Sequence, residues 1–270
     1  MTRNRLAVWG DPIAHSKSPD LHAAAYRVLG FDWHYGRRQT DTADFTAALA
    51  GLDDSWRGLS LTMPLKEAAF QAAATHDRHA ELTGAVNTLL WGDVLAGFNT
   101  DVGGIVDSLT AADVHHVERV RILGAGATAA SALVAAAEMG ASEIEVRARR
   151  PESAIALEQI GHQMGVVVRT HAFESSPEPV DLTIATLPSG TALSEETVTP
   201  LATHGGALFD AAYAPWPSAL AVAWREHTVI SGLEMLLHQA VRQIRIFDHG
   251  DPAVALPHED AVVAAMRAAL

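Results

Sequence analysis

The sequence contains no cysteine, which excludes disulfide bonds, thiolate metal sites and cysteine nucleophiles. It also lacks the run of roughly 20 apolar residues that crosses a bilayer, because Glu, Asp, Arg or Gly interrupts its Ala-rich stretches. Near the start, the apolar run from Leu6 to Trp9 ends at Gly10, which is too soon for a signal peptide. We therefore expect a cytoplasmic protein with no membrane partner.

Basic residues are scarce, since 19 Lys and Arg are outnumbered by 32 Asp and Glu, and the formal net charge is −13. Sequence-independent binding to nucleic acid needs a basic surface that replaces the counterions around phosphates. We therefore expect no nucleic-acid partner. The apolar fraction of 49% predicts a compact fold rather than disorder, and 270 residues suffice for two domains of ordinary size.

Short apolar runs with β-branched residues alternate with longer Ala/Leu-rich stretches of helical period, a pattern typical of an α/β protein. Predicted strands cover residues 6–9, 58–61, 120–123, 144–146, 166–169, 182–185 and 207–209. Predicted helices cover residues 19–29, 44–52, 66–74, 103–112, 128–140, 232–247 and 258–269. Ser18 is predicted to cap the first helix, and Asp101 stands just ahead of another. The polar segment 113–119 indicates that a new structural unit begins there.

A glycine-rich turn follows the predicted strand at 120–123. Residues 124–129 read Gly-Ala-Gly-Ala-Thr-Ala and lead into a helix. In such a turn Gly124 allows the tight bend, Gly126 lets the backbone approach a pyrophosphate, and Ala129 lets helix and strand pack closely. The predicted dinucleotide-binding residues here are Gly124, Ala125, Gly126, Ala127 and Thr128. The alternative is a tight strand–helix turn without a ligand.

The segment of the next predicted strand, residues 143–150, carries Arg149 and Arg150 at its end and no acidic residue there. NAD-binding proteins usually place Asp or Glu there for the ribose hydroxyls, whereas arginine accommodates the 2′-phosphate of NADP. A guanidinium also supplies fixed donors for a phosphate. We therefore predict that the cofactor is NADP and that both arginines contact it. The alternative is a solvated basic helix start, because surface arginines are common.

A polar turn at residues 10–19 places Ser16 and Ser18 ahead of the first predicted helix. Their hydroxyls are neutral donors, and a helix start adds backbone amides and a favourable dipole, so the turn could bind a carboxylate. The alternative is that Ser18 only caps its helix.

Four polar motifs precede the glycine-rich turn, and two follow it. They lie at residues 10–19, 61–66, 84–88, 99–104, 210–215 and 232–239. In this order they resemble the shikimate dehydrogenase family along nearly the whole chain. The first four are similar to its segments G-x-P-I-x-H-S-x-S-P, V-T-x-P-x-K, G-A-V-N-T and N-T-D-x-x-G. Residues 215–217, Pro-Trp-Pro, look like the loop variant of actinobacterial members.

The resemblance implies an α/β fold of two domains. Residues 1–103 would form a substrate-binding and catalytic domain with a mostly parallel sheet, completed by C-terminal helices in residues 240–270. Residues 104–239 would form a Rossmann domain that binds NADP. The implied reaction is the reversible reduction of 3-dehydroshikimate to shikimate by hydride transfer from NADPH, in aromatic amino-acid biosynthesis. The expected partner is this small-molecule substrate, and the chain would be a monomer or homodimer.

The resemblance also implies residue roles, with Lys66 and Asp101 as the catalytic pair. Hydride reduction of a ketone develops charge on oxygen, which an ammonium group can stabilise and protonate while a carboxylate orients the lysine or relays the proton. The implied substrate-binding residues are Ser16, Ser18, Thr62, Lys66, Asn87, Asp101, Tyr213 and Gln239. Gly232 and Met235 would adjoin the cofactor.

Each of these roles has a simpler alternative. Lys66 could be an exposed lysine at a helix start, Asp101 an N-cap, Tyr213 an aromatic wedge and Met235 a core residue. The chain also departs from the family: Ser60 replaces a common Asn, and residues 185–190 read A-T-L-P-S-G where N-x-T-P-x-G is usual.

Fourteen histidines raise the question of a metal, but no carboxylate accompanies them at the spacing of a catalytic metal helix, so none is expected. Rival functions are a quinate/shikimate dehydrogenase with relaxed substrate or NAD preference, and a non-catalytic ligand-binding module of the same fold.

Overall fold

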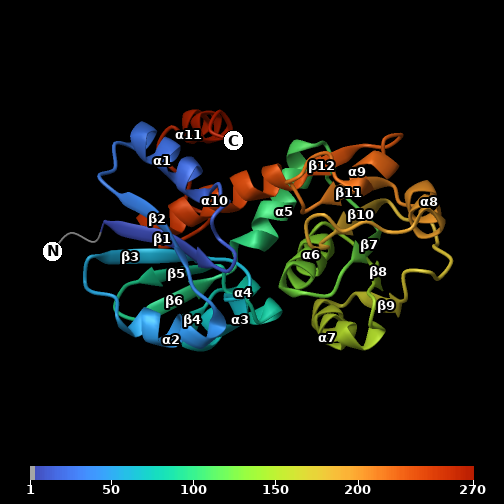
Figure 1. The fold of residues 1–270 in the computed structure, drawn as a ribbon, viewed down its shortest axis with the longest axis horizontal. Helices are drawn as coiled ribbons and strands as arrows, with labels where there is room; N and C mark the ends of the chain where they lie inside the picture. Colours follow the sequence, from blue (N-terminus) through green and yellow to red (C-terminus); the bar gives the residue numbers. More distant parts are fainter. Residues whose placement is uncertain (1–3) are drawn as a thin grey trace. The chain divides into compact units, whose positions relative to one another are not determined.

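The structure is a computed structural model that describes residues 4–270, and its chain divides into two compact units (Figure 1). Unit 1 runs up to Thr100 and is completed by Leu236–Leu270, and unit 2 comprises Asp101–Met235. The domain boundaries predicted from the sequence lie after residues 103 and 239. Among helices formed by the described residues, none combines the length and the apolar character needed to cross a membrane.

Unit 1 is built on a mixed sheet with the strand order β2-β1-β3-β5-β6-β4. Its strands are β1 (Arg5–Gly10), β2 (His34–Gln39), β3 (Trp56–Leu61), β4 (Thr75–His76), β5 (Thr88–Trp91) and β6 (Leu95–Phe98). Strand β1 pairs in parallel with β2 and β3, and β4 pairs in parallel with β6. Strand β5 is antiparallel to both of its neighbours. The sheet is thus mostly parallel, as predicted.

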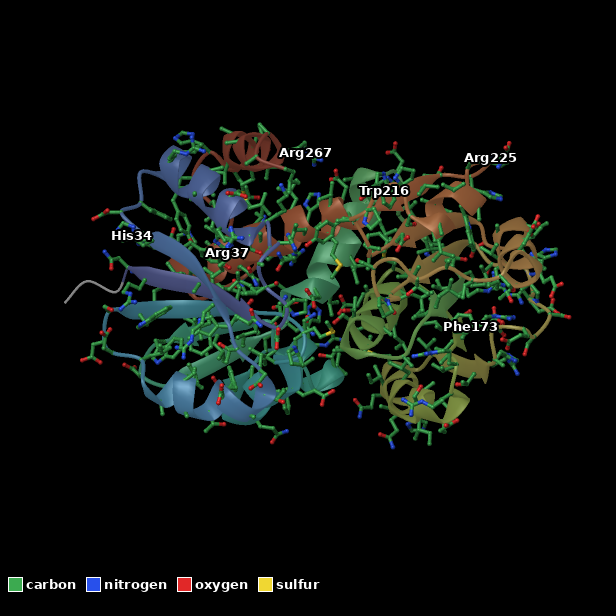
Figure 2. All side chains as sticks on the ribbon, in the orientation of Figure 1. His34, Arg37, Phe173, Trp216, Arg225 and Arg267 are labelled. Atoms are coloured by element: carbon green, nitrogen blue, oxygen red, sulfur yellow. The ribbon has the colours of Figure 1, made fainter. Side chains whose placement is uncertain are left out.

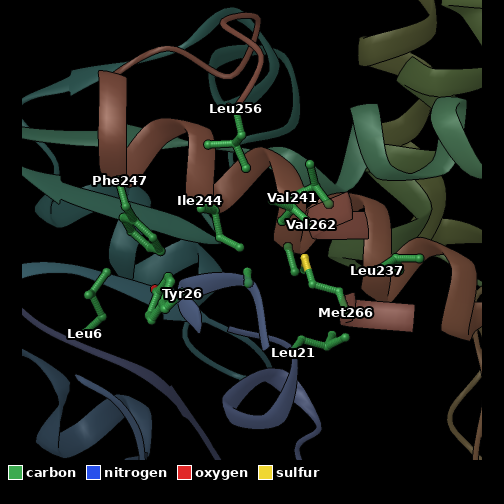
Figure 3. Packing of buried hydrophobic residues seen from close by; sticks show 12 residues of the cluster. Leu6, Leu21, Tyr26, Leu237, Val241, Ile244, Phe247, Leu256, Val262 and Met266 are labelled. Carbon is green, nitrogen blue, oxygen red and sulfur yellow. The ribbon is translucent and has the colours of Figure 1, made fainter. Parts of the chain in front are cut away.

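Helices cover both faces of this sheet (Figure 1). On one face lie α1 (Ser18–Leu29), α11 (Glu259–Arg267) and the unit 1 part of α10 (Gly232–His249), which share a buried apolar cluster shown in Figure 3. The other face carries α2 (Thr42–Ala50), α3 (Lys66–Ala72) and α4 (Arg78–Thr83). Successive residues of β1 alternate between these cores, since Leu6 joins the first and Ala7 the second. Burying a leucine of this kind stabilises the fold by about 2 kcal/mol.

Unit 2 is built on a parallel sheet with the order β12-β11-β10-β7-β8-β9. Its strands are β7 (Arg119–Leu123), β8 (Glu143–Arg147), β9 (Val167–His171), β10 (Leu182–Ala185), β11 (Ala207–Asp210) and β12 (Val229–Ser231). Its helices are α5 (Thr100–Ala111), α6 (Ala127–Glu138), η1 (Pro151–Ala154, a 3-10 helix), α7 (Ile155–Met164), α8 (Glu195–Thr203) and α9 (Ala219–Ala223). Helix α5 belongs to unit 2 from its second residue, Asp101. Numbered from β7, the order is that of dinucleotide-binding Rossmann sheets, which confirms the predicted fold class.

The structure corrects two predicted helix starts. Ser18 does not cap α1, because the N-cap is Lys17 and Ser18 is already helical. Helix α5 begins at Thr100 rather than Gly103, so Asp101 lies in its first turn rather than ahead of it. The reason is that the Asn87 side chain accepts a hydrogen bond from the Thr100 N–H at 2.9 Å and so caps the helix from another segment.

Candidate active site

The turns that follow β1 and β3 lie against each other in unit 1. The Thr62 N–H donates to the Trp9 carbonyl at 3.0 Å, and the Asp11 N–H donates to the Met63 carbonyl at 2.9 Å. Gly10 is required at this contact, because a Cβ there would lie 2.4 Å from Cγ2 of Thr62. The predicted substrate residue Thr62 is thereby held beside the turn that carries Ser16 and Ser18.

Ser16, rather than Ser18, satisfies the first backbone amide of α1. The Ser16 Oγ accepts from the Ser18 N–H at 3.3 Å, while the Ser16 N–H donates to the Ile13 carbonyl at 3.0 Å. Ser16 is partly exposed and Ser18 is buried. The structure therefore brings the two serines together at a helix start, the arrangement that suits an anion.

Edge strand β2 holds the same turn from the other side. Arg37, labelled in Figure 2, donates from its guanidinium to the Ala14 carbonyl. Gln39 donates from Nε2 to Oδ1 of Asp11 at 2.9 Å. These two side chains restrain the first half of the turn, at Asp11 and Ala14. Neither was predicted to have a role, because the polar sequence of β2 does not read as a strand.

A buried polar cluster joins the start of β5 to the start of α5. The Asn87 Nδ2 donates to the Thr100 Oγ at 2.9 Å, and Oδ1 of Asn87 accepts from the Thr88 Oγ at 2.8 Å. The Thr100 Oγ also lies 3.5 Å from Oε1 of Gln239 on α10. The predicted substrate residues Asn87 and Gln239 thus meet at Thr100, immediately before Asp101.

Asp77 supports this cluster from β4 and α4. Its Oδ1 accepts from the Ala80 N–H at 2.8 Å, which caps α4, and from the Asn99 N–H at 3.1 Å. Burial raises the pKa of Asp77, and the two backbone donors oppose this shift. Asn99 in turn donates from Nδ2 to the Thr83 Oγ at 2.8 Å. The backbone that leads to Thr100 and Asp101 is therefore fixed by side chains on both sides.

Lys66 and Asp101, the predicted catalytic pair, each stand in the first turn of a helix. Lys66 is the first residue of α3 and is partly exposed. Asp101 is the second residue of α5 and only 5% exposed. A carboxylate in the first turn is favoured by the helix dipole and an ammonium is not, so the position of Lys66 is not explained by helix stability.

In unit 2 the glycine-rich turn has the predicted backbone. Gly124 has φ 117°, and a Cβ there would lie 2.5 Å from the Thr186 Oγ. Gly126 is the N-cap of α6, and a Cβ on it would meet nothing within 4 Å. Ala129 is fully buried. The turn residues Ala125, Ala127 and Thr128 are partly exposed, so their amides lie at the surface of this unit.

Of the other predicted cofactor residues, Arg149, Arg150 and Gly232 follow the carboxyl ends of parallel strands, where Rossmann sheets bind their ligands. Arg149 and Arg150 follow β8 and are exposed. Gly232 directly follows β12, and a Cβ there would lie 2.1 Å from the Ala211 carbonyl oxygen after β11. Tyr213 is half-buried, which raises the pKa of its hydroxyl. Met235 is buried.

Several polar residues with structural roles at these sites were not predicted. Gln243 lies one helical turn beyond Gln239 and hydrogen bonds to the cluster around Asn87. Its signal was the spacing of four, which puts two glutamines on one helix face. In unit 2, Arg121 and Arg147 are fully buried and both pair with Glu145. No group of three or more His, Asp or Glu side chains among residues 4–270 could hold a metal ion.

Proteins of known family are similar to this chain in sequence and in fold. The family described as the shikimate dehydrogenase substrate binding domain matches residues 8–89. The NADP(+) shikimate dehydrogenase of Methanothermobacter thermautotrophicus is 34% identical over 91% of this chain and 91% of its own length. The crystal structure of the Mycobacterium tuberculosis shikimate dehydrogenase is 36% identical with a TM-score of 0.87, and covers 98% of this chain and 99% of its own. A Thermus thermophilus shikimate 5-dehydrogenase solved with NADP(H) and shikimate is 29% identical, with a TM-score of 0.82 over 99% of this chain and 100% of its own.

Proposed function

The chain belongs to the shikimate dehydrogenase family, and on this premise we propose how its own residues carry out the reaction. The activity is the reversible, NADP-dependent reduction of 3-dehydroshikimate to shikimate in aromatic amino-acid biosynthesis. The observation that carries the residue assignment is the buried meeting of Asn87, Thr100 and Gln239 directly before Asp101. Such a cluster offers both donors and acceptors to ring hydroxyls.

Ser16 and Ser18 bind the substrate carboxylate in this proposal. The turn that carries them is held by β2 and by the turn after β3, so their hydroxyls are positioned before the ligand arrives. The start of α1 adds backbone amides and the positive end of its dipole. Local donors of this kind are needed, because the net charge of −13 disfavours an anion at long range.

Lys66 and Asp101 perform the proton chemistry. As the ketone is reduced, negative charge develops on its oxygen, and the Lys66 ammonium group stabilises this charge and donates the proton. The Asp101 carboxylate orients the lysine, and its place in the first turn of α5 is favourable for a negative charge. In the reverse direction neutral Lys66 accepts the proton from the substrate hydroxyl. Thr62, Asn87 and Gln239 hold the ring hydroxyls during both steps.

The residues of unit 2 fit NADP. Gly126 leaves open space where a Cβ would project, so a pyrophosphate can approach the amides at the start of α6. Arg149 and Arg150 are exposed after β8 and would contact the 2′-phosphate. We also assign Tyr213 to the substrate, and Gly232 and Met235 to the nicotinamide end of the cofactor. When bound, NADPH would supply the hydride for the reduction, and NADP+ would accept it in the reverse direction.

The test is the reduction of NADP by shikimate, followed at the absorbance of NADPH in the purified chain and its variants. Lys66→Ala should lower kcat at least a hundredfold with little change in KM, because the interaction is strongest in the transition state. Asp101→Asn should also lower kcat. Glu67→Gln, an exposed change in the same helical turn as Lys66, is the matched control and should leave the kinetics intact.

Two outcomes would contradict the proposal. An unchanged kcat in Lys66→Ala would remove Lys66 from the chemistry. Equal kcat/KM values for NADP and NAD, or for shikimate and quinate, would instead indicate a quinate/shikimate dehydrogenase with relaxed substrate or cofactor preference.

A further inference from the structure

We propose that Gln243 on α10 is a positioning residue that fixes the orientation of the Asn87 amide through the hydroxyl of Thr88. The inference rests on the proposed role of Asn87 in binding the ring hydroxyls of the substrate. It adds a residue that does not itself touch the ligand.

Gln243 sits at a junction of three segments of unit 1. Its Oε1 accepts from the Ser60 Oγ at 2.8 Å. Its Nε2 donates to the Thr88 Oγ at 3.0 Å and to the Asn87 carbonyl at 3.2 Å. Gln243 is 2% exposed, and Thr88 is fully buried. Water therefore does not compete for these contacts, and the protein alone determines the geometry.

The hydrogen bonds around Thr88 have a fixed direction. A hydroxyl has one proton to donate, and the Thr88 Oγ accepts one hydrogen bond from Gln243. Its own proton is then directed to Oδ1 of Asn87, 2.8 Å away. Gln243 thus determines where the Thr88 proton points.

Oδ1 of Asn87 therefore accepts from the Thr88 hydroxyl and from the Thr100 N–H, and the Thr100 Oγ lies 3.2 Å from it. If the amide rotated by half a turn, its NH2 group would face both donors. That arrangement would leave buried polar groups without partners, at a cost in free energy. The amide is thereby held with Oδ1 towards the Thr88 hydroxyl and the Thr100 N–H, and with Nδ2 2.9 Å from the Thr100 hydroxyl.

This orientation matters for the reaction because Asn87 presents one donor end and one acceptor end. A rotated amide would exchange the two ends and mismatch the ring hydroxyls that it binds. Gln239, which meets the same Thr100 hydroxyl, lies one turn from Gln243 on α10. One face of α10 therefore carries both Gln239, which binds the ligand in the proposed function, and Gln243, which orients Asn87.

The test compares four variants. Thr88→Val removes the hydroxyl at nearly constant volume, and Gln243→Met removes the Nε2 donor. Each should raise KM for shikimate about five- to tenfold, the effect of one lost hydrogen bond, while KM for NADP stays unchanged. Thr88→Ser keeps the hydroxyl and should restore the wild-type KM. The double variant Thr88→Val/Gln243→Met should be no worse than either single change, because both interrupt one relay.

Gln163→Met, at an exposed position of α7, is the control for the glutamine change. Thermal melts show whether each variant is folded, and if Gln243→Met does not fold, the Thr88→Val and Thr88→Ser pair decides. An unchanged KM for shikimate in a folded Thr88→Val or Gln243→Met overturns the inference, as does a double variant whose effects multiply.

Wild-type inactivity would overturn the proposed function instead. Calorimetric titration of shikimate into the same proteins then compares binding without turnover. Weaker binding in Thr88→Val with rescue in Thr88→Ser supports the inference, and equal binding overturns it.

Discussion

Gly10 and Thr62 lie closer together than a side chain at position 10 would allow, since a Cβ there would be 2.4 Å from Cγ2 of Thr62 and 2.8 Å from the Met63 carbonyl oxygen. The second contact is with backbone, which cannot rotate away. Two turns that carry proposed substrate residues are joined at this point.

Gly10→Ala should therefore lower the free energy of unfolding by about 1–3 kcal/mol, the usual cost of overpacking, and raise KM for shikimate more than KM for NADP. Gly36→Ala on neighbouring β2 is the control, because its Cβ would meet nothing within 4 Å. Urea denaturation and steady-state kinetics measure both effects. A Gly10→Ala enzyme with wild-type stability would contradict the close contact.

The two glycines of the Rossmann turn should respond differently to alanine. Gly126→Ala meets nothing in the protein, so stability should change by less than about 1 kcal/mol, yet the methyl group should obstruct the pyrophosphate and raise KM for NADP. Gly124→Ala should destabilise the fold, because the residue has φ 117° and its Cβ would contact the Thr186 hydroxyl. Similar thermal melts for the two variants would disprove this distinction.

Arg149→Ala should raise KM for NADP about tenfold or more, because a charge-assisted contact with the 2′-phosphate is lost. KM for NAD, which has no such phosphate, should change little. Arg225→Ala provides the control at an arginine that is 75% exposed (Figure 2). Equal losses for both nucleotides would indicate that Arg149 acts on the fold rather than on the phosphate.

Glu145 is the shared partner of two arginines whose side chains are 0% exposed. Glu145→Gln should lower the free energy of unfolding by about 3–5 kcal/mol, because it leaves buried charges uncompensated. Glu143→Gln is the control. Glu143 forms an ion pair with Arg119 on the same two strands, at 3.6 Å, and the two side chains are 46% and 44% exposed. Its cost should be below about 1 kcal/mol. Equal costs would disprove the role of burial.

His22 should make the protein less stable in mild acid. Burial lowers the pKa of His22 to about 3, whereas the unfolded chain has a value of roughly 6.5. Below that value the unfolded state binds a proton that the folded state does not, so stability falls as pH falls from 6.5 towards 3. The contribution between pH 7 and 5 is about 2 kcal/mol.

His22→Gln should remove this part of the pH dependence, measured as the difference in unfolding free energy between the variant and the wild type at each pH. A constant difference would show that His22 is not held neutral. The variant also loses the stacking of the His22 ring on Tyr35, with centroids 3.8 Å apart. This loss is the same at every pH, so it does not change the pH dependence of the difference in unfolding free energy.

The glycine-rich turn and the parallel order of unit 2 could be predicted because their requirements are local. A strand, a glycine that tolerates φ 117°, a small residue and a helix follow one another in the chain. The predicted helices were found to within a few residues for the same reason. Strands β2, β4, β5, β6 and β12 were missed, because edge exposure and short length hide their alternation.

By itself the sequence determined the α/β class, the Rossmann turn and, through its motifs, the family. Only the tertiary structure decided that Asn87 caps α5, that Gln243 hydrogen bonds to Asn87 and Thr88, and that Arg121 and Arg147 share Glu145. Each of these contacts joins residues on different segments of the chain, and the local periodicity of the sequence does not predict such partners. Their energy depends on burial, which is known only once the layers have packed.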